Sequence, residues 1–159
     1  CYKNCPEGKK KITRKSKCVD SCSEDSEYIL EYNNSCYNNC PEGKKKIIEE
    51  KICVDSCSGE YILEYSNSCV QGCPDNSKLI IDKSLCIDSC SNDNEYKLEY
   101  NNTCYKQCPN NTKLMSHNKQ CVDSCNNDDE YKLEYNNQCY KECPALAMAL
   151  RTGSKQWCP

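Results

Sequence analysis

The pentapeptide Cys-Val-Asp-Ser-Cys occupies residues 18–22 and returns at 53–57 and 121–125, with Cys-Ile-Asp-Ser-Cys at 86–90. Paired cysteines of this kind serve as metal ligands, redox centres or disulfides. The chain has 19 cysteines in 159 residues but a single histidine. Zinc sites favour two or four residues between paired cysteines, and redox centres use two, whereas three separate each pair here. The pattern therefore predicts disulfides, with no metal ion and no cofactor.

Composition also indicates a disulfide scaffold. Cysteine makes up about 12% of the chain, above the ~8–10% that marks such scaffolds, and much of the 37% hydrophobic share is Cys and Tyr. Few residues remain for an apolar core, so covalent bridges must supply the missing stability. Because disulfides persist outside the reducing cytosol, we expect an extracellular or cell-surface protein of the secretory route. No apolar run approaches the ~18 residues of a membrane span, and the start at Cys1 leads us to expect a fragment of a longer array.

The cysteine pairs recur at a regular interval along the chain. Successive pairs begin 16 to 18 residues apart, and two kinds alternate, of which one is followed by proline and the other is the pentapeptide. A full repeat is therefore about 35 residues long. We predict four repeats, at 1–35, 36–68, 69–103 and 104–138, followed by a partial repeat and divergent tail at 139–159.

Each half of a repeat has the signals of a short β-hairpin. The hexamer Glu-Tyr-Ile/Lys-Leu-Glu-Tyr occurs at 27–32, 60–65, 95–100 and 130–135, and a turn containing Asn and a second β-prone start follow it. In the other half, a run such as Lys-Lys-Lys-Ile leads through a polar link to Cys-Val. β-Prone runs around turn-forming residues predict hairpins. The predicted fold is a small disulfide-rich all-β protein, an elongated tandem array of short β-hairpin modules stapled by a sequential disulfide ladder.

Two disulfide schemes fit the spacing. Paired cysteines in one strand lie roughly 13 Å apart, whereas bridged Cα atoms lie within ~7 Å, so each cysteine bonds elsewhere. In an interlocked scheme, Cys1 bonds Cys18 and Cys5 bonds Cys22. In a sequential ladder, the second cysteine of one pair bonds the first of the next, and Cys1 is left for a module upstream. The ladder predicts Cys5–Cys18, Cys22–Cys36, Cys40–Cys53, Cys57–Cys69, Cys73–Cys86, Cys90–Cys104, Cys108–Cys121, Cys125–Cys139 and Cys143–Cys158.

Charge alternates along the chain with the period of the cysteines. Segments that carry proline after the cysteine pair are neutral or basic, the intervening ones are acidic, and the net charge is −3. Such alternation is typical of a solvated surface, or of basic modules that face acidic modules of a neighbouring chain. The second interpretation predicts self-association into filaments or lateral bundles. Nucleic acid is not an expected partner, because each lysine-rich stretch is followed by an acidic one and no basic face accumulates.

Tyrosine dominates the aromatic residues, with twelve Tyr against one Trp. We expect the rings to pack over disulfides and neighbouring hairpins, with their hydroxyls in water. The alternative is a stripe that binds carbohydrate or protein. This candidate stripe consists of two recurring positions in each repeat, Tyr28, Tyr32, Tyr61, Tyr65, Tyr96, Tyr100, Tyr131 and Tyr135.

Three Asn-x-Ser/Thr sequences mark candidate glycosylation sites at Asn33, Asn101 and Asn110. In a secreted chain they predict N-linked glycans on surface loops.

The remaining polar residues give no sign of catalysis. The aspartates of the pentapeptide are expected to form Asx turns between the two cysteines. His117 has no repeated counterpart and is expected to be an exposed loop residue. No nucleophile–base or paired-carboxylate arrangement recurs, so we predict no catalytic residues and no enzyme activity.

The openings Cys-x-x-x-Cys-Pro-[Glu/Asp/Asn]-[Gly/Asn] are each followed about a dozen residues later by another cysteine. Over residues 1–143 this pattern resembles furin-like, growth-factor-receptor-type cysteine-rich repeats, and more closely the long cysteine-rich surface proteins of single-celled eukaryotes. The resemblance implies a rod-like spacer, stalk, adhesin or coat component. We therefore expect an extracellular structural protein that forms a filament, coat or stalk; the alternative is a receptor or adhesin ectodomain that binds carbohydrate or protein through its tyrosines.

Overall fold

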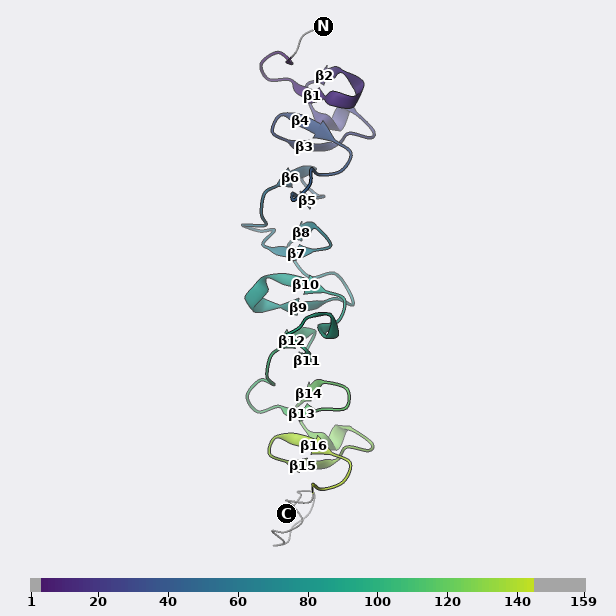
Figure 1. The fold of residues 1–159 in the computed structure, drawn as a ribbon, viewed down its shortest axis with the longest axis vertical. Coiled ribbons are helices and arrows are strands. Elements are labelled where there is room, and N and C mark those ends of the chain that lie inside the picture. Colours follow the sequence, from purple (N-terminus) through teal and green to yellow (C-terminus); the bar gives the residue numbers. More distant parts are fainter. Residues whose placement is uncertain (1–3, 145–159) are drawn as a thin grey trace. The chain divides into compact units, whose positions relative to one another are not determined.

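The computed structural model describes residues 4–144, which contain strands and short 3-10 helices but no α-helix (Figure 1). The all-β prediction is thus confirmed for this part of the chain. The chain divides into two compact units, Cys1–Cys73 and Pro74–Pro159. Every strand described in them is three residues long, and consecutive strands pair as antiparallel hairpins.

The first unit contains four hairpins. They are β1 (Lys10–Ile12) with β2 (Lys17–Val19), β3 (Leu30–Tyr32) with β4 (Ser35–Tyr37), β5 (Lys45–Ile47) with β6 (Ile52–Val54), and β7 (Leu63–Tyr65) with β8 (Ser68–Val70). The 3-10 helices η1 (Thr13–Lys15) and η2 (Cys22–Glu24) lie in their connections.

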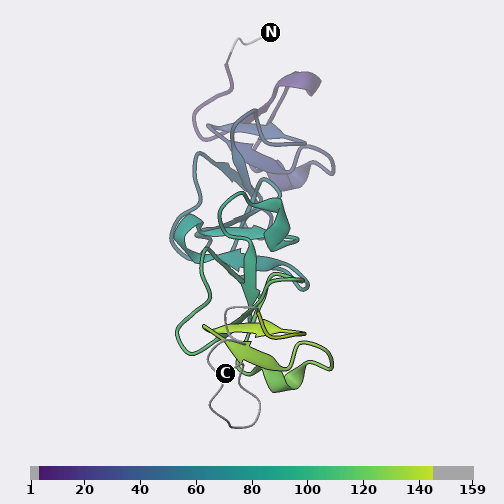
Figure 2. The same ribbon diagram turned by 60° about the horizontal axis from the view of Figure 1, so that its bottom comes forward.

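The second unit repeats this plan (Figure 2). Its hairpins are β9 (Lys78–Ile80) with β10 (Leu85–Ile87), β11 (Leu98–Tyr100) with β12 (Thr103–Tyr105), β13 (Lys113–Met115) with β14 (Gln120–Val122), and β15 (Leu133–Tyr135) with β16 (Gln138–Tyr140). Its 3-10 helices are η3 (Ile81–Lys83), η4 (Cys90–Asn92) and η5 (Cys125–Asn127).

Two kinds of turn close the hairpins. Asn33 and Asn34 alone join β3 to β4, with φ of 46° and 58°. A two-residue turn with positive φ at both positions matches the twist of the flanking strands, and Asn tolerates this conformation well. The wider turns end on a single left-handed residue, such as Ser16 between β1 and β2. The Asn pairs seen in the sequence therefore fix the hairpin register.

Each described disulfide closes one hairpin on itself. Seven bonds lie within the described parts of the two units, with Cα–Cα distances of 5.3–5.7 Å. They confirm the ladder for those pairs and show that the interlocked scheme is wrong, because Cys18 bonds Cys5 and Cys22 bonds Cys36. Cys73, Cys86 and Cys143 are also in disulfides. Cys1 and Cys158 lie outside the described residues.

Within a unit, neighbouring hairpins meet through one parallel bridge. The first strand of each hairpin pairs with the second strand of the next, as β1 does with β4. The backbone N–H of Lys11 donates to the carbonyl of Asn34 at 3.0 Å, and that of Glu31 donates to Lys51 at 2.9 Å. Both acceptors are left-handed turn residues, so the conformation that closes one hairpin also directs a carbonyl toward its neighbour. The same bond recurs in the second unit, from Leu79 to Asn102, from Glu99 to Lys119 and from Leu114 to Asn137.

The cores are small and rich in sulfur. In the first unit, buried Ile12 and Val19 pack with Cys22 and Cys36. The second unit has two such clusters, the first around Ile80, Cys90, Tyr96 and Cys104 and the second around Met115, Cys125 and Cys139. Because the disulfide itself is a core element, few aliphatic side chains are needed per hairpin.

Candidate functional site: the joints between hairpins

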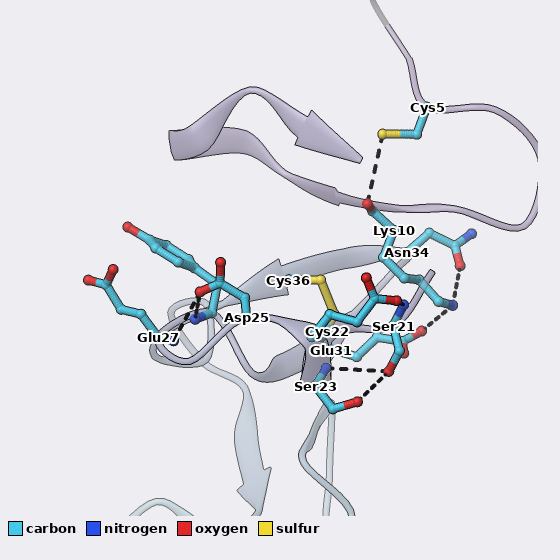
Figure 3. Close-up of a disulfide and its surroundings, with 12 residues drawn as sticks. Cys5, Lys10, Ser21, Cys22, Ser23, Asp25, Glu27, Glu31, Asn34 and Cys36 are labelled. Carbon is cyan, nitrogen blue, oxygen red and sulfur yellow. Dashed lines mark hydrogen bonds and ion pairs between the residues drawn. A yellow bond between two sulfur atoms is a disulfide. The ribbon is translucent and has the colours of Figure 1, made fainter. Parts of the chain in front are cut away.

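The most regular side-chain arrangement lies where one hairpin meets the next. Lys10 of β1 reaches across to β3 and the turn that follows it, where its Nζ lies 2.5 Å from Glu31 Oε1 and 3.1 Å from Asn34 Oδ1 (Figure 3). We call such a group of Lys, Glu and Asn a lysine triad. It recurs in all four repeats as Lys10–Glu31–Asn34, Lys45–Glu64–Asn67, Lys78–Glu99–Asn102 and Lys113–Glu134–Asn137.

The lysine triads have nearly the same geometry. Nζ lies 2.5–2.8 Å from the carboxylate and 2.9–3.1 Å from the carboxamide oxygen. The lysine side chains are 18–22% exposed, so each ammonium is partly withdrawn from water. Ion pairs at this exposure contribute on the order of 0.2–1 kcal/mol each. The triads therefore add modest, repeated support to the single backbone bond at the first and third joints of each unit.

The second tyrosine of the hexamer forms another contact between hairpins. Tyr32 donates its hydroxyl to Asp55 at 2.8 Å, and Lys44 lies 2.6 Å from the same carboxylate. These two donors lower the pKa of Asp55. Tyr100 donates in the same way to Asp123, which raises the pKa of Tyr100. Both hydroxyls thus bond an aspartate of the next hairpin at an exposed contact, and the expectation that they also lie in water stays a prediction.

The first tyrosine of the hexamer packs against the tip of the preceding hairpin. Lys15 lies over the ring of Tyr28 at 5.0 Å, and Lys83 lies over Tyr96 at 5.2 Å. In the fourth repeat, His117 stacks on Tyr131 with ring centroids 3.8 Å apart. His117 is exposed, as expected, and its ring covers a tyrosine. Packing thus explains three of the four tyrosines in this half of the candidate stripe, Tyr28, Tyr96 and Tyr131, and ligand binding by either half stays a prediction.

The Asx turns lie at a different aspartate from the one expected. Asp25 accepts from the backbone N–H groups of Glu27 and Tyr28 and from Lys15, which together hold the pKa of Asp25 well below its usual range. Asp93 and Asp128 form the same turn. The expectation for the pentapeptide is wrong at Asp55 and Asp123, because their described bonds reach back to the preceding hairpin. In three of the four pentapeptides, the serine that follows the aspartate caps the next 3-10 helix, as Ser21, Ser89 and Ser124 do.

The alternating charges pair within the chain. Lysines of the basic segments contact carboxylates of the acidic ones, as in Lys9–Asp20 and Lys15–Asp25 in the first unit and Lys83–Asp93 in the second. Intramolecular pairing therefore accounts for much of the pattern. Pairing between chains stays a prediction.

The three candidate glycosylation sites lie on exposed turns. Asn33 and Asn101 occupy the first position of two-residue turns, while the neighbouring Asn34 and Asn102 belong to lysine triads. Asn110 lies in the turn after Pro109 and is exposed. Exposure is a condition for glycosylation that all three positions meet, and their occupancy stays a prediction.

The lysine triads were missed in the sequence, although their signal was present. Each lysine stands two residues before a buried Ile or Met, and each asparagine stands two residues before a cysteine. Each glutamate is the second glutamate of the hexamer. The recurrence was visible, but only the parallel bridge shows that the three positions meet.

Among residues 4–144, no three His, Cys, Asp or Glu side chains are grouped so as to hold a metal ion. The same residues contain no helix with the length and apolar character needed to cross a bilayer. What the arrangement provides is a repeated set of contacts between closed hairpins.

Comparisons of the chain with protein-family models, with curated proteins and with solved structures find no match. The resemblance to furin-like repeats therefore stays a hypothesis.

Proposed function

We propose that the protein is a non-enzymatic extracellular structural protein, a rod-like cysteine-rich array that builds a filament, coat or stalk. The observation that carries the proposal is the repeated joint, in which disulfide-closed hairpins meet through the same backbone bond, with a lysine triad added at the first and third joints of each unit. In such an array each unit depends mainly on its neighbours, so length can vary without changing the joint. This property suits a spacer.

The proposed location follows from the cysteines. Each loop closed by a bond between cysteines 12–14 residues apart stabilises the chain by about 3 kcal/mol in the chain-entropy model. The small cores cannot replace that contribution. An oxidising compartment, and hence the cell surface or the extracellular space, supplies the conditions under which the scaffold forms.

The proposed partners are further copies of the chain and N-linked glycans. Because many lysines already pair with carboxylates of their own chain, self-association would rely on exposed apolar and tyrosine side chains as well as on charge. Glycans at Asn33, Asn101 and Asn110 would extend from turns and leave the hairpin strands uncovered.

Secretion of the full chain from a eukaryotic host, followed by small-angle scattering and negative-stain microscopy, tests this proposal. We expect extended particles that assemble into filaments or bundles, and a mass decrease on treatment with a glycosidase that removes N-linked glycans. A compact monomer, or free thiols in the native material, would contradict it.

A receptor or adhesin ectodomain is the second candidate, and one feature of the second unit favours it. A surface hollow of about 430 Å³ is lined by Ile81, Asp82, Tyr96, Tyr105 and Lys106, which combine apolar and aromatic faces with charged groups. Tyrosine rings with polar neighbours suit sugars and protein side chains. Binding on a glycan array that Tyr105→Ala abolishes and Tyr140→Ala leaves intact would support this function, and an array without binding would contradict it.

A further inference from the structure

Each lysine triad places a primary amine against a carboxamide with a carboxylate beside both. In the fourth repeat, Lys113 Nζ lies 3.0 Å from Asn137 Oδ1 and 2.8 Å from Glu134 Oε1. An amine, an amide carbonyl and a group that can carry a proton between them are the components of amide exchange. Holding such groups in contact replaces a bimolecular encounter with an intramolecular step, worth effective concentrations of about 10⁵ M or more when the alignment is good.

We propose that the lysine triads are sites of intramolecular isopeptide bonds, in which lysine Nζ becomes bonded to Cγ of asparagine and ammonia is released. The glutamate carboxylate first takes a proton from the lysine ammonium. The freed amine lone pair then attacks Asn Cγ, which forms the new C–N bond and a tetrahedral oxyanion. The glutamic acid returns its proton to the amide nitrogen, whose bond to Cγ breaks. The departing ammonia takes the second proton from the newly bonded lysine nitrogen as the oxyanion reforms the carbonyl. The products are a secondary amide and an ammonium ion, and the glutamate is unchanged, so no oxidant or other reactant is required.

The four triads differ in solvent exposure, and this difference predicts how readily each one reacts. Transfer of a proton within the Lys–Glu pair is favoured where the ions are poorly solvated, because desolvation disfavours both charged forms. Glu134 is 16% exposed, whereas Glu31 and Glu64 are 35% and 36% exposed. The lysines differ little, at 18–22%. Reaction is therefore expected to proceed furthest at Lys113–Asn137.

The isopeptide bond would link two hairpins, whereas each described disulfide closes only one. Each of those disulfides closes a single hairpin, such as Cys108–Cys121 around β13 and β14. The side chains of Lys113 and Asn137 belong to consecutive hairpins, because Lys113 lies in β13 and Asn137 in the turn between β15 and β16. An isopeptide bond would therefore link neighbouring hairpins covalently. The inference stands on the triad geometry and does not depend on where the protein resides.

The test is mass spectrometry of the purified full chain after complete reduction and alkylation. We expect a mass below that of the sequence by one ammonia per bond, and a peptide in which the Lys113 segment is joined to the Asn137 segment, with trypsin failing to cleave after Lys113. Lys113→Arg keeps the positive charge but removes the amine, and Glu134→Gln keeps the shape but removes the proton carrier. Each should abolish this cross-linked peptide.

Lys141→Arg is the matched control, because the described ion pair of Lys141 is with Glu130, and it should leave the cross-linked peptide unchanged. Non-reducing peptide maps of all variants establish that the disulfides have formed. A mass equal to that of the sequence overturns the proposal, and so does an ammonia deficit without a Lys–Asn peptide, since a succinimide formed at asparagine has the same mass.

Discussion

The loops that precede the first tyrosine of the hexamer, Tyr61 in the second repeat and Tyr96 in the third, are built differently. In the third repeat, Ser89 caps η4, and Asp93 accepts from the backbone N–H groups of Glu95 and Tyr96 and from Lys83. Tyr96 is buried there, at 8% exposure, and its hydroxyl donates to Asp82 at 2.7 Å.

The second repeat lacks two residues at this place, and with them the aspartate. Gly59, with φ of 62°, turns the chain, and Ser58 forms an isolated bridge with Tyr61. Tyr61 is half-buried, and its burial, with Glu49, Glu50 and Glu60 nearby, raises its pKa.

Despite these differences, the hairpins that follow are the same. The Cys57–Cys69 and Cys90–Cys104 bonds have Cα–Cα distances of 5.3 and 5.4 Å, and the strands pair in equivalent registers. The comparison indicates that the disulfide and the two-residue turn define the hairpin, while the aspartate network refines the loop.

Removal of the disulfides should have the largest effect. We expect Cys57→Ser/Cys69→Ser and Cys90→Ser/Cys104→Ser each to lose about 3 kcal/mol from the hairpin concerned. The first pair should expose its hairpin more, because no aspartate network supports its loop. Hydrogen exchange of β7–β8 and β11–β12 measures both, and unchanged protection in the two variants would refute the primary role of the disulfide.

Substitution of Gly59 should have an intermediate effect. An added Cβ meets no atom within 4 Å, so the cost of Gly59→Ala is that of a left-handed conformation, roughly 1–2 kcal/mol. Gly72→Ala is the matched control, since its Cβ also meets nothing and its backbone is not left-handed. Thermal unfolding distinguishes the two, and equal losses would show that the loop does not need its glycine.

Low pH should produce the smallest effect, a loss of stability in the loop of the third repeat that the loop of the second repeat does not share. The pKa of Asp93 lies well below its value in an unfolded chain, so its ionised form stabilises the loop above about pH 4 and that stabilisation is lost as the pH falls further. Amide exchange at Glu95 and Tyr96 should therefore accelerate relative to Tyr61 on acidification. Equal acceleration in both loops would mean that Asp93 does not hold its loop.

The hairpins and the ladder could be predicted because their causes are local. The Asn33–Asn34 pair lies between β-prone runs and needs no tertiary information to predict a turn. The regular spacing of the cysteines restricted the disulfides to two schemes, although only the structure decided between them. The elongated form and the repeat boundaries stay predictions, and the boundary after Ser35 falls within β4.

The joints could not be predicted because they depend on which strands of successive hairpins meet. Lys10 and Glu31 are 21 residues apart, and only the parallel β1–β4 bridge brings them together. The role of Asp55 was missed for the same reason, since its partner Tyr32 is 23 residues away. A short polar side chain near a turn signal predicts an Asx turn. Here the carboxylate of Asp55 instead accepts a hydrogen bond from the hydroxyl of Tyr32, which is distant in the sequence.

Peptide mapping of the native protein without reduction tests the central claim, that each hairpin is closed by its own disulfide. Cleavage between the cysteines should yield Cys22 joined to Cys36 and Cys90 joined to Cys104, with the other described bonds in the same sequential order. Interlocked pairs such as Cys5–Cys22, or unmodified thiols that bind zinc, would contradict the account.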